Sequence, residues 1–293
     1  MSECALCPRN CKVNREKGEL GFCGAGDSVK IARAELHFWE EPCISGENGS
    51  GTVFFSCCNM KCVYCQNYCI SAENKGRKVT SEELSDEFLK LQSKGANNIN
   101  LVTPTHFVPQ IMKSLDIAKS KGLKLPVVYN CGGYESVETI KRLSGYVDIY
   151  MPDMKYFSDK YAVRYSAAPD YFNTAKAAIQ EMFAQVGKPT FDERGIMQKG
   201  VIVRHMMLPG LLFDTKKIID YLYNTYEDDI YISLMSQYTP MPNVKNIPEL
   251  DRKISEKQYE AMVEYAAGIG VKNAFVQDGT SVGESFIPDF YNE

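Results

Sequence analysis

The stretch that decides the fold reads Gly51-Thr52-Val53-Phe54-Phe55-Ser56-Cys57-Cys58-Asn59-Met60-Lys61-Cys62-Val63-Tyr64-Cys65-Gln66-Asn67. A run of β-branched and aromatic residues leads directly into Cys58, Cys62 and Cys65, which are spaced C-x3-C-x2-C. Thiolates are the soft ligands that iron–sulfur clusters and zinc prefer. Three thiolates in one loop can hold three irons of a cubane cluster and leave the fourth iron open. An open metal position distinguishes a reactive metal site from a purely structural one.

The composition is ordinary for a globular enzyme. The chain has 293 residues, of which 44% are hydrophobic and 24% charged. A chain of this length buries roughly three quarters of the surface that its unfolded form exposes, so it needs no cross-links to fold. The net charge is −4, and there is no long basic stripe. Nucleic acid is therefore not the partner that we expect.

Eleven cysteines are a high number for this length. The first residues contain no charged-then-apolar signal segment, and no apolar run approaches membrane length, so we expect a cytoplasmic protein without a membrane partner. In a reducing compartment, clustered cysteines bind metal more often than they form disulfides. The odd total also leaves at least one thiol unpaired in any scheme of disulfides alone.

A second group of cysteines lies within the first 30 residues. Cys4, Cys7, Cys11 and Cys23 are spaced C-x2-C-x3-C-x11-C, with glycines interleaved that let the backbone turn tightly. Four soft ligands at this spacing predict a metal site that binds zinc or a second iron–sulfur cluster. Buried free thiols are the alternative. We divide the chain into a cysteine-rich segment with an exposed connection, residues 1–50, and one large domain, residues 51–293.

From residue 51 onward, short apolar runs alternate with helical patterns. Strands are expected near residues 52–56, 98–103, 126–130, 147–150, 200–205, 230–235 and 273–276. Two helix starts are marked by capping boxes, Thr80 with Glu83 and Ser255 with Gln258. The alternation predicts an α/β fold of parallel βαβ units that form a barrel or part of one. The chemistry of such barrels lies at the carboxyl ends of the strands, where the cysteine loop follows the first strand.

At this point the chain resembles the radical S-adenosylmethionine superfamily, and over nearly its whole length the branch related to pyruvate formate-lyase activating enzymes. The resemblance is carried by the cysteine loop, with Tyr64 before its last cysteine, and by residues 4–11, 41–46, 103–106, 148–155 and 204–210 in the same order. It implies a partial parallel (β/α)6 barrel with a 4Fe-4S cluster on Cys58, Cys62 and Cys65. It also implies that the open iron binds S-adenosylmethionine, whose reductive cleavage yields a 5′-deoxyadenosyl radical that abstracts hydrogen.

The resemblance also implies which residues contact the cofactor. These are Tyr64, Asn67, Thr103, Thr105, Asn130, Asp153, Lys155, Arg204 and Gln237. Three alternatives stay open: Asn130 as a turn residue, Asp153 with Lys155 as a surface ion pair, and His205 as a structural histidine. The chain departs from the family in having Cys57 where glycine is usual before the first cluster cysteine. It also lacks the ferredoxin-like insertion of the longer activating enzymes.

The activity that the resemblance implies is that of an oxidoreductase similar to the activating enzymes of glycyl radical enzymes. It would abstract hydrogen from an unidentified protein or peptide and receive electrons from a flavodoxin- or ferredoxin-like reductant. The polar segments 157–170 and 187–200 are candidates for the partner surface. The alternatives are a radical enzyme that acts on a small molecule, and a non-catalytic iron–sulfur or zinc protein for electron transfer or binding.

Overall fold

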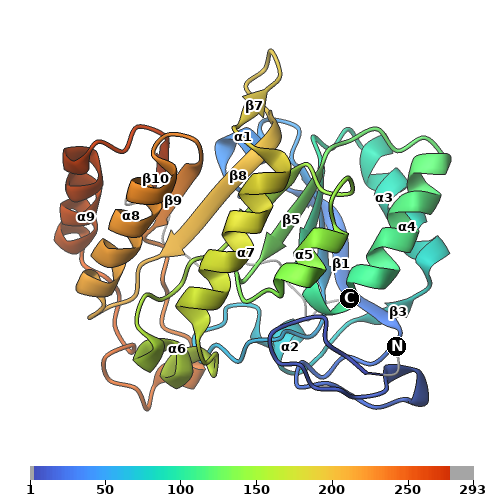
Figure 1. The fold of residues 1–293 in the computed structure, drawn as a ribbon, viewed down its shortest axis with the longest axis horizontal. Helices are drawn as coiled ribbons and strands as arrows, with labels where there is room; N and C mark the ends of the chain where they lie inside the picture. The colour runs from blue at the N-terminus through green and yellow to red at the C-terminus, as the bar shows by residue number, and fades with distance from the viewer. Residues whose placement is uncertain (1–2, 278–293) are drawn as a thin grey trace.

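A computed structural model describes residues 3–277 of the protein (Figure 1). The described strands form one ten-stranded sheet. In chain order the strands are β1 (Val29–His37), β2 (Ser50–Phe55), β3 (Arg77–Val79), β4 (Ile99–Val102), β5 (Val127–Cys131), β6 (Ile149–Pro152), β7 (Thr190–Phe191), β8 (Met197–Met206), β9 (Tyr231–Met235) and β10 (Ala274–Val276). Their order across the sheet is β10-β9-β8-β6-β5-β4-β2-β1-β3, and β7 pairs with β8.

The seven strands from β2 to β10 along this path pair in parallel. Because sequential parallel strands are neighbours throughout, each connection crosses one face of the sheet and carries the helices there. The sheet stays open: its two ends are β10 and β3. The predicted α/β fold with a partial parallel barrel is confirmed, and all seven predicted strands are present within three residues of their expected bounds.

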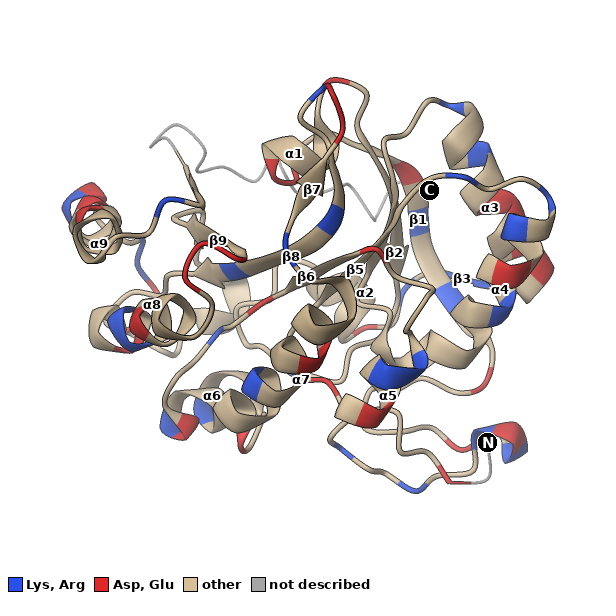
Figure 2. Ribbon diagram, turned by 45° about the horizontal axis from the view of Figure 1, so that its top comes forward, with Lys and Arg blue, Asp and Glu red and all other residues tan. Residues whose placement is uncertain are grey.

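The helices are α1 (Pro42–Ser45), α2 (Tyr68–Ser71), α3 (Ser81–Ser93), α4 (Val108–Ser120), α5 (Val137–Arg142), α6 (Asp159–Ser166), α7 (Tyr171–Val186), α8 (Leu212–Tyr226) and α9 (Glu256–Ile269). In Figure 1, α5 and α7 lie over the middle of the sheet. Both predicted capping boxes are present, at the starts of α3 and α9. Acidic and basic residues are mixed along α3, α8 and α9 (Figure 2). No helix within residues 3–277 combines the length and apolar character that crossing a membrane requires.

Two expectations about connections are wrong. The exposed connection was expected over residues 31–50, but residues 31–37 belong to the nine-residue strand β1, which pairs antiparallel with β2 and β3. Most of its side chains are only half-buried, which explains why its alternation is weak. Segment 187–200 does not lie on the rim with the cysteine loop. It contains β7 and the start of β8, which pair as a hairpin at the end of the sheet away from the cysteine loop (Figure 1).

The core explains the placement of the cysteine loop. Strand β2 is buried along its full length, as a strand covered on both faces must be. Residues 56–67 leave its carboxyl end and pack on the end of α6, where Lys61 and Val63 donate N–H bonds to the carbonyls of Ser166 and Tyr165 at 3.0 and 2.9 Å. The predicted division between residues 50 and 51 falls one residue into β2, the strand that pairs with β1.

Candidate cluster and ligand site

The three cysteines of the C-x3-C-x2-C motif line one cavity. Its other lining residues are Met60, Lys61, Val63, Tyr68, Ser71, Ala72 and Asn243. Each sulfur has a hydrogen-bond partner: Cys58 accepts the N–H of Met60 at 3.4 Å, Cys62 accepts the Ser166 hydroxyl at 3.0 Å, and Cys65 pairs with the Ser71 hydroxyl at 3.3 Å. Such bonds stabilise metal-bound thiolates and tune their redox potential.

Burial raises the pKa of the Cys58 thiol, and it raises the pKa of Cys65 to about 11. Buried thiols of this kind ionise when a metal centre supplies the compensating positive charge. Within residues 3–277, no three His, Cys, Asp or Glu side chains are spaced to share one metal ion. Three thiols of one loop suit a cluster, which distributes its ligands over several irons.

Cys57 stands apart from these three thiols. Its φ of +75° lies in the left-handed region, which glycine adopts most readily. This conformation explains why the family usually has glycine here. The Cys57 side chain is buried and lines a different cavity, together with Arg15 and Lys30. Burial raises the pKa of its thiol to about 11.

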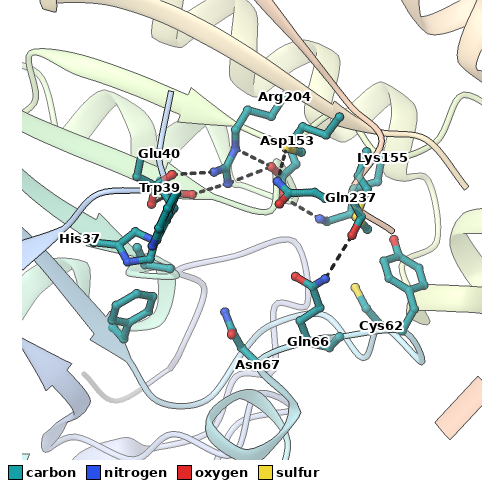
Figure 3. A pocket seen from close by; sticks show the side chains of 17 residues that line it. His37, Trp39, Glu40, Cys62, Gln66, Asn67, Asp153, Lys155, Arg204 and Gln237 are labelled. Carbon is teal, nitrogen blue, oxygen red and sulfur yellow. Dashed lines mark hydrogen bonds and ion pairs between the residues drawn. The ribbon is translucent and has the colours of Figure 1, made fainter. Parts of the chain in front are cut away.

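A second, polar cavity adjoins the first at the carboxyl ends of the strands (Figure 3). It is lined by His37, Trp39, Glu40, Phe54, Cys62, Tyr64, Cys65, Gln66, Asn67, Val102, Asn130, Asp153, Lys155, Arg204, Met206, Met235 and Gln237. Cys62 and Cys65 line both cavities. A metal centre on the three cysteines would therefore face the charged side chains of the polar cavity.

Arg204 is the centre of this charged network (Figure 3). Its guanidinium lies 3.2 Å from a Glu40 carboxylate oxygen and 3.0 Å from one of Asp153, and it donates to the Asn130 side-chain oxygen at 2.6 Å. Lys155 Nζ lies 2.5 Å from the other Asp153 oxygen. Strands β5, β6 and β8 end side by side, so three neighbouring strand ends bring Asn130, Asp153 and Arg204 together.

The charged groups of this network shift one another's pKa values against the effect of burial. Burial acts to raise the pKa of Asp153, but Lys155 and Arg204 outweigh it and hold that pKa below its usual range. Burial acts to lower the pKa of Lys155, and the Asp153 carboxylate raises it instead. For Glu40, burial dominates over the attraction of Arg204, so its pKa is raised. Two acids and two bases thus give the cavity charges of both signs.

Seven of the predicted cofactor contacts line the polar cavity: Tyr64, Asn67, Asn130, Asp153, Lys155, Arg204 and Gln237. Thr103 and Thr105 are not among its lining residues. The Thr105 side chain is buried, and its hydroxyl donates to the Glu135 carboxylate at 2.7 Å, so it is committed to the protein interior. Thr103 takes a left-handed φ of +59° in the turn after β4.

Two of the three open interpretations, those for the Asp153–Lys155 pair and for His205, are decided by burial and hydrogen bonding. Asp153 and Lys155 are not a surface pair, because their side chains are only 14% and 18% exposed. His205 is structural: its ring nitrogens contact the Met154 carbonyl at 2.7 Å and the Thr215 hydroxyl at 2.9 Å. Burial lowers the pKa of His205 to about 4, so the ring is neutral.

Several lining residues were missed by sequence reasoning, above all Glu40. It follows β1, and because that strand was not predicted, the position of its end was not predicted either. The paired acids at positions 40 and 41 before Pro42 were the available signal. Met206 and Met235 end β8 and β9 and line the cavity beside Arg204. Trp39, which is 60% exposed, lies at the rim.

The fold and the site together define a class: an α/β protein with a thiolate metal site that opens onto a charged pocket at the strand ends. The model of the Radical SAM superfamily matches residues 52–222. The chain belongs to this superfamily. Its members use a 4Fe-4S cluster and S-adenosylmethionine for redox radical chemistry, which makes this protein a radical S-adenosylmethionine enzyme.

Among curated proteins, the chain is similar to the uncharacterized protein MJ0674 of Methanocaldococcus jannaschii. The two are 30% identical over 273 residues, which cover 90% of this chain and 74% of the relative. Among solved structures, it is similar to anSMEcpe with bound AdoMet, with a TM-score of 0.51 and 13% identity over 75% of this chain and 60% of that one.

The chain is also similar to Streptococcus suis SuiB, solved with S-adenosylmethionine and with the precursor peptide SuiA. The TM-scores are 0.51 and 0.50, the identities 10% and 11%, and 75% of this chain is covered in each case. The chain spans 48% and 46% of the length of those two SuiB structures. At these identities the likeness shows a shared fold.

Proposed function

We propose that Cys58, Cys62 and Cys65 hold the 4Fe-4S cluster and that the adjoining polar cavity binds S-adenosylmethionine. The observation that carries this proposal is that Cys62 and Cys65 line both cavities. When bound, the reduced cluster supplies one electron that splits S-adenosylmethionine into methionine and a 5′-deoxyadenosyl radical, which takes a hydrogen atom from the substrate. The protein contributes binding, orientation and exclusion of water.

The charged network supplies groups for both ends of an amino acid moiety. Arg204 and Lys155 present cationic groups to a carboxylate. Glu40 and Asp153 present carboxylates to an ammonium group. Because these four side chains already hold one another by ion pairs, they are fixed before a ligand arrives, which lowers the entropy cost of binding.

The substrate that we infer is a protein or peptide, as for activating enzymes of the pyruvate formate-lyase type. Two observations support it. The rim of the polar cavity carries the aromatic side chain of Trp39, which is 60% exposed and can contact an extended chain. The similar fold of SuiB has been solved with a precursor peptide. We further infer a flavodoxin- or ferredoxin-like protein as the one-electron donor.

The test has two stages. The anaerobically reconstituted, reduced protein is given S-adenosylmethionine, and 5′-deoxyadenosine is measured. Wild type should form it, whereas Cys62→Ala should lose both cluster and product. The reaction is then repeated with an extract of the source cells, separated by ultrafiltration into macromolecules and small molecules. Stimulation by the macromolecular fraction supports a protein or peptide substrate. Stimulation by the small-molecule fraction alone would refute it.

A further inference from the structure

The second group of cysteines lies outside the site described above, and its thiols also lie in a folded, largely buried environment. We call residues 3–28 the N-terminal cysteine segment. Cys4, Cys7 and Cys23 are 2%, 6% and 3% exposed, Cys11 is partly exposed, and all four are free thiols. Reciprocal backbone bonds, Cys4 N–H to the Val13 carbonyl and Lys12 N–H to the Cys4 carbonyl, both 3.0 Å, close the first part of the segment into a loop.

Two of the sulfurs converge on a small space that Gly21 leaves open. A Cβ atom at position 21 would lie 3.5 Å from the sulfur of Cys23 and 3.6 Å from that of Cys11. Cys11 Sγ accepts the N–H of Phe22 at 3.3 Å, and Cys23 Sγ accepts the N–H of Ala25 at 3.4 Å. Backbone N–H groups aimed at sulfur are a feature of metal-bound thiolates.

The other two thiols belong to the same electrostatic neighbourhood. Burial raises the pKa of Cys7 to about 12, and the nearby Cys23 and Cys11 thiols add to that rise. Burial also raises the pKa of Cys23, with Cys4 and Cys11 contributing in the same direction. These mutual effects place the four thiols near one another.

A buried arginine supports such a centre from outside. Arg15 is 4% exposed, and its guanidinium donates to the His106 carbonyl at 2.6 Å and to Cys23 Sγ at 3.5 Å. Its Nε is buried and has no hydrogen-bond partner among the described residues. Neutral thiols give a buried guanidinium no opposite charge, whereas a centre with four thiolates carries net negative charge and attracts it.

We propose that Cys4, Cys7, Cys11 and Cys23 bind a second iron–sulfur cluster, closed by four protein thiolates, with Arg15 balancing its negative charge. The described residues contain no group of three ligands placed around a single ion, which favours a cluster over zinc. One tetrahedral zinc ion with Zn–S bonds of about 2.3 Å would hold its four sulfurs about 3.8 Å apart. No three potential ligands within residues 3–277 are spaced for a single ion, and this applies equally to Cys58, Cys62 and Cys65, where the superfamily binds a cluster.

The second cluster would lie beside the first. Arg9 of the N-terminal cysteine segment donates from Nε to the Asn59 carbonyl at 2.8 Å, next to Cys58 in the chain. Cys57, the residue before Cys58, lines the same cavity as Arg15 of this segment. The structure therefore puts a closed cluster next to the open one.

The experiment measures iron, acid-labile sulfide and zinc in the full-length protein after anaerobic reconstitution. Wild type should contain about eight irons and eight sulfides per chain, as two 4Fe-4S clusters require. Cys4→Ser/Cys7→Ser should lose about half of the iron and keep a reduced-state paramagnetic signal that changes on addition of S-adenosylmethionine. Cys58→Ser/Cys62→Ser should also lose about half, but should keep a signal that does not respond to S-adenosylmethionine.

Cys43→Ser/Cys69→Ser is the matched control, because both thiols are buried at 7% and 4% exposure and belong to neither group. It should keep all of the iron. Unchanged iron in Cys4→Ser/Cys7→Ser, or one zinc per chain that disappears in this variant, would overturn the proposal. The retained signal shows whether that variant is folded. Since S-adenosylmethionine changes only the signal from the open cluster, failure of the second cluster can be distinguished from failure of the proposed function.

Discussion

Replacing Arg204 by methionine tests the charged network directly. Its guanidinium lies 3.2 Å from Glu40 and 3.0 Å from Asp153, and the three side chains are only 16%, 9% and 14% exposed. Removing one partner of a buried ion pair costs about 3–5 kcal/mol, because the remaining charge stays buried without compensation. Asp153 keeps Lys155 as its partner, so Glu40 carries most of the loss. We expect the free energy of unfolding to fall by about 3 kcal/mol.

The double variant Arg204→Met/Glu40→Gln should recover about 2 kcal/mol of that loss, because the uncompensated carboxylate is gone. Stability is measured by guanidinium unfolding of the anaerobic holoprotein, followed by circular dichroism. Arg194→Met is the control: its ion pair with Asp192 is exposed, and the change should cost less than about 1 kcal/mol. Strict additivity of the two substitutions, or equal losses in Arg204→Met and Arg194→Met, would refute the reasoning.

Three further outcomes are expected. Burial raises the pKa of Glu135 to about 7, so its stabilising contribution is full below the unfolded pKa near 4.3 and is lost as pH rises to about 7. Glu135→Gln should therefore gain up to about 3 kcal/mol relative to wild type between pH 5 and 8 in urea unfolding. Ser166→Ala removes the hydroxyl donor to Cys62 and should lower the midpoint potential of the open cluster in a redox titration, whereas Ser114→Ala should not. Trp39, the single tryptophan, should shift its emission to the blue when S-adenosylmethionine covers it.

Local patterns in the sequence were enough to predict most of the fold. Strand β2 reads as a continuous apolar run because both of its faces are covered. The capping boxes at Thr80 and Ser255 are complete within four residues, so they are readable without tertiary context. Strand β1 was missed because pairing at the less covered end of the sheet leaves most of its side chains half-buried, and that weakens the alternation on which a prediction depends.

The site was predictable only where residues follow strand ends. Arg204 was found because it ends a predicted strand, and Asp153 because the family resemblance pointed to it; both lie at strand ends of the parallel sheet. Their neighbour Glu40 contacts Arg204 across 164 residues of sequence, and no local pattern reports such a contact. Thr105 was assigned to the cofactor because its loop follows β4. Its partner Glu135 belongs to another loop, and their hydrogen bond turns the hydroxyl away from the cavity.

The two groups of cysteines form one structural unit around Cys57. This residue holds a left-handed conformation that costs a non-glycine residue about 1 kcal/mol, so surrounding contacts must maintain it. The Cys57 N–H donates to the Ile70 carbonyl at 2.8 Å, and the preceding Ser56 carbonyl contacts His106 Nε2 at 2.7 Å. Arg15 in turn donates to the His106 carbonyl. The N-terminal cysteine segment therefore contacts the turn that presents Cys58, and loss of the proposed second cluster would loosen the loop of the open cluster.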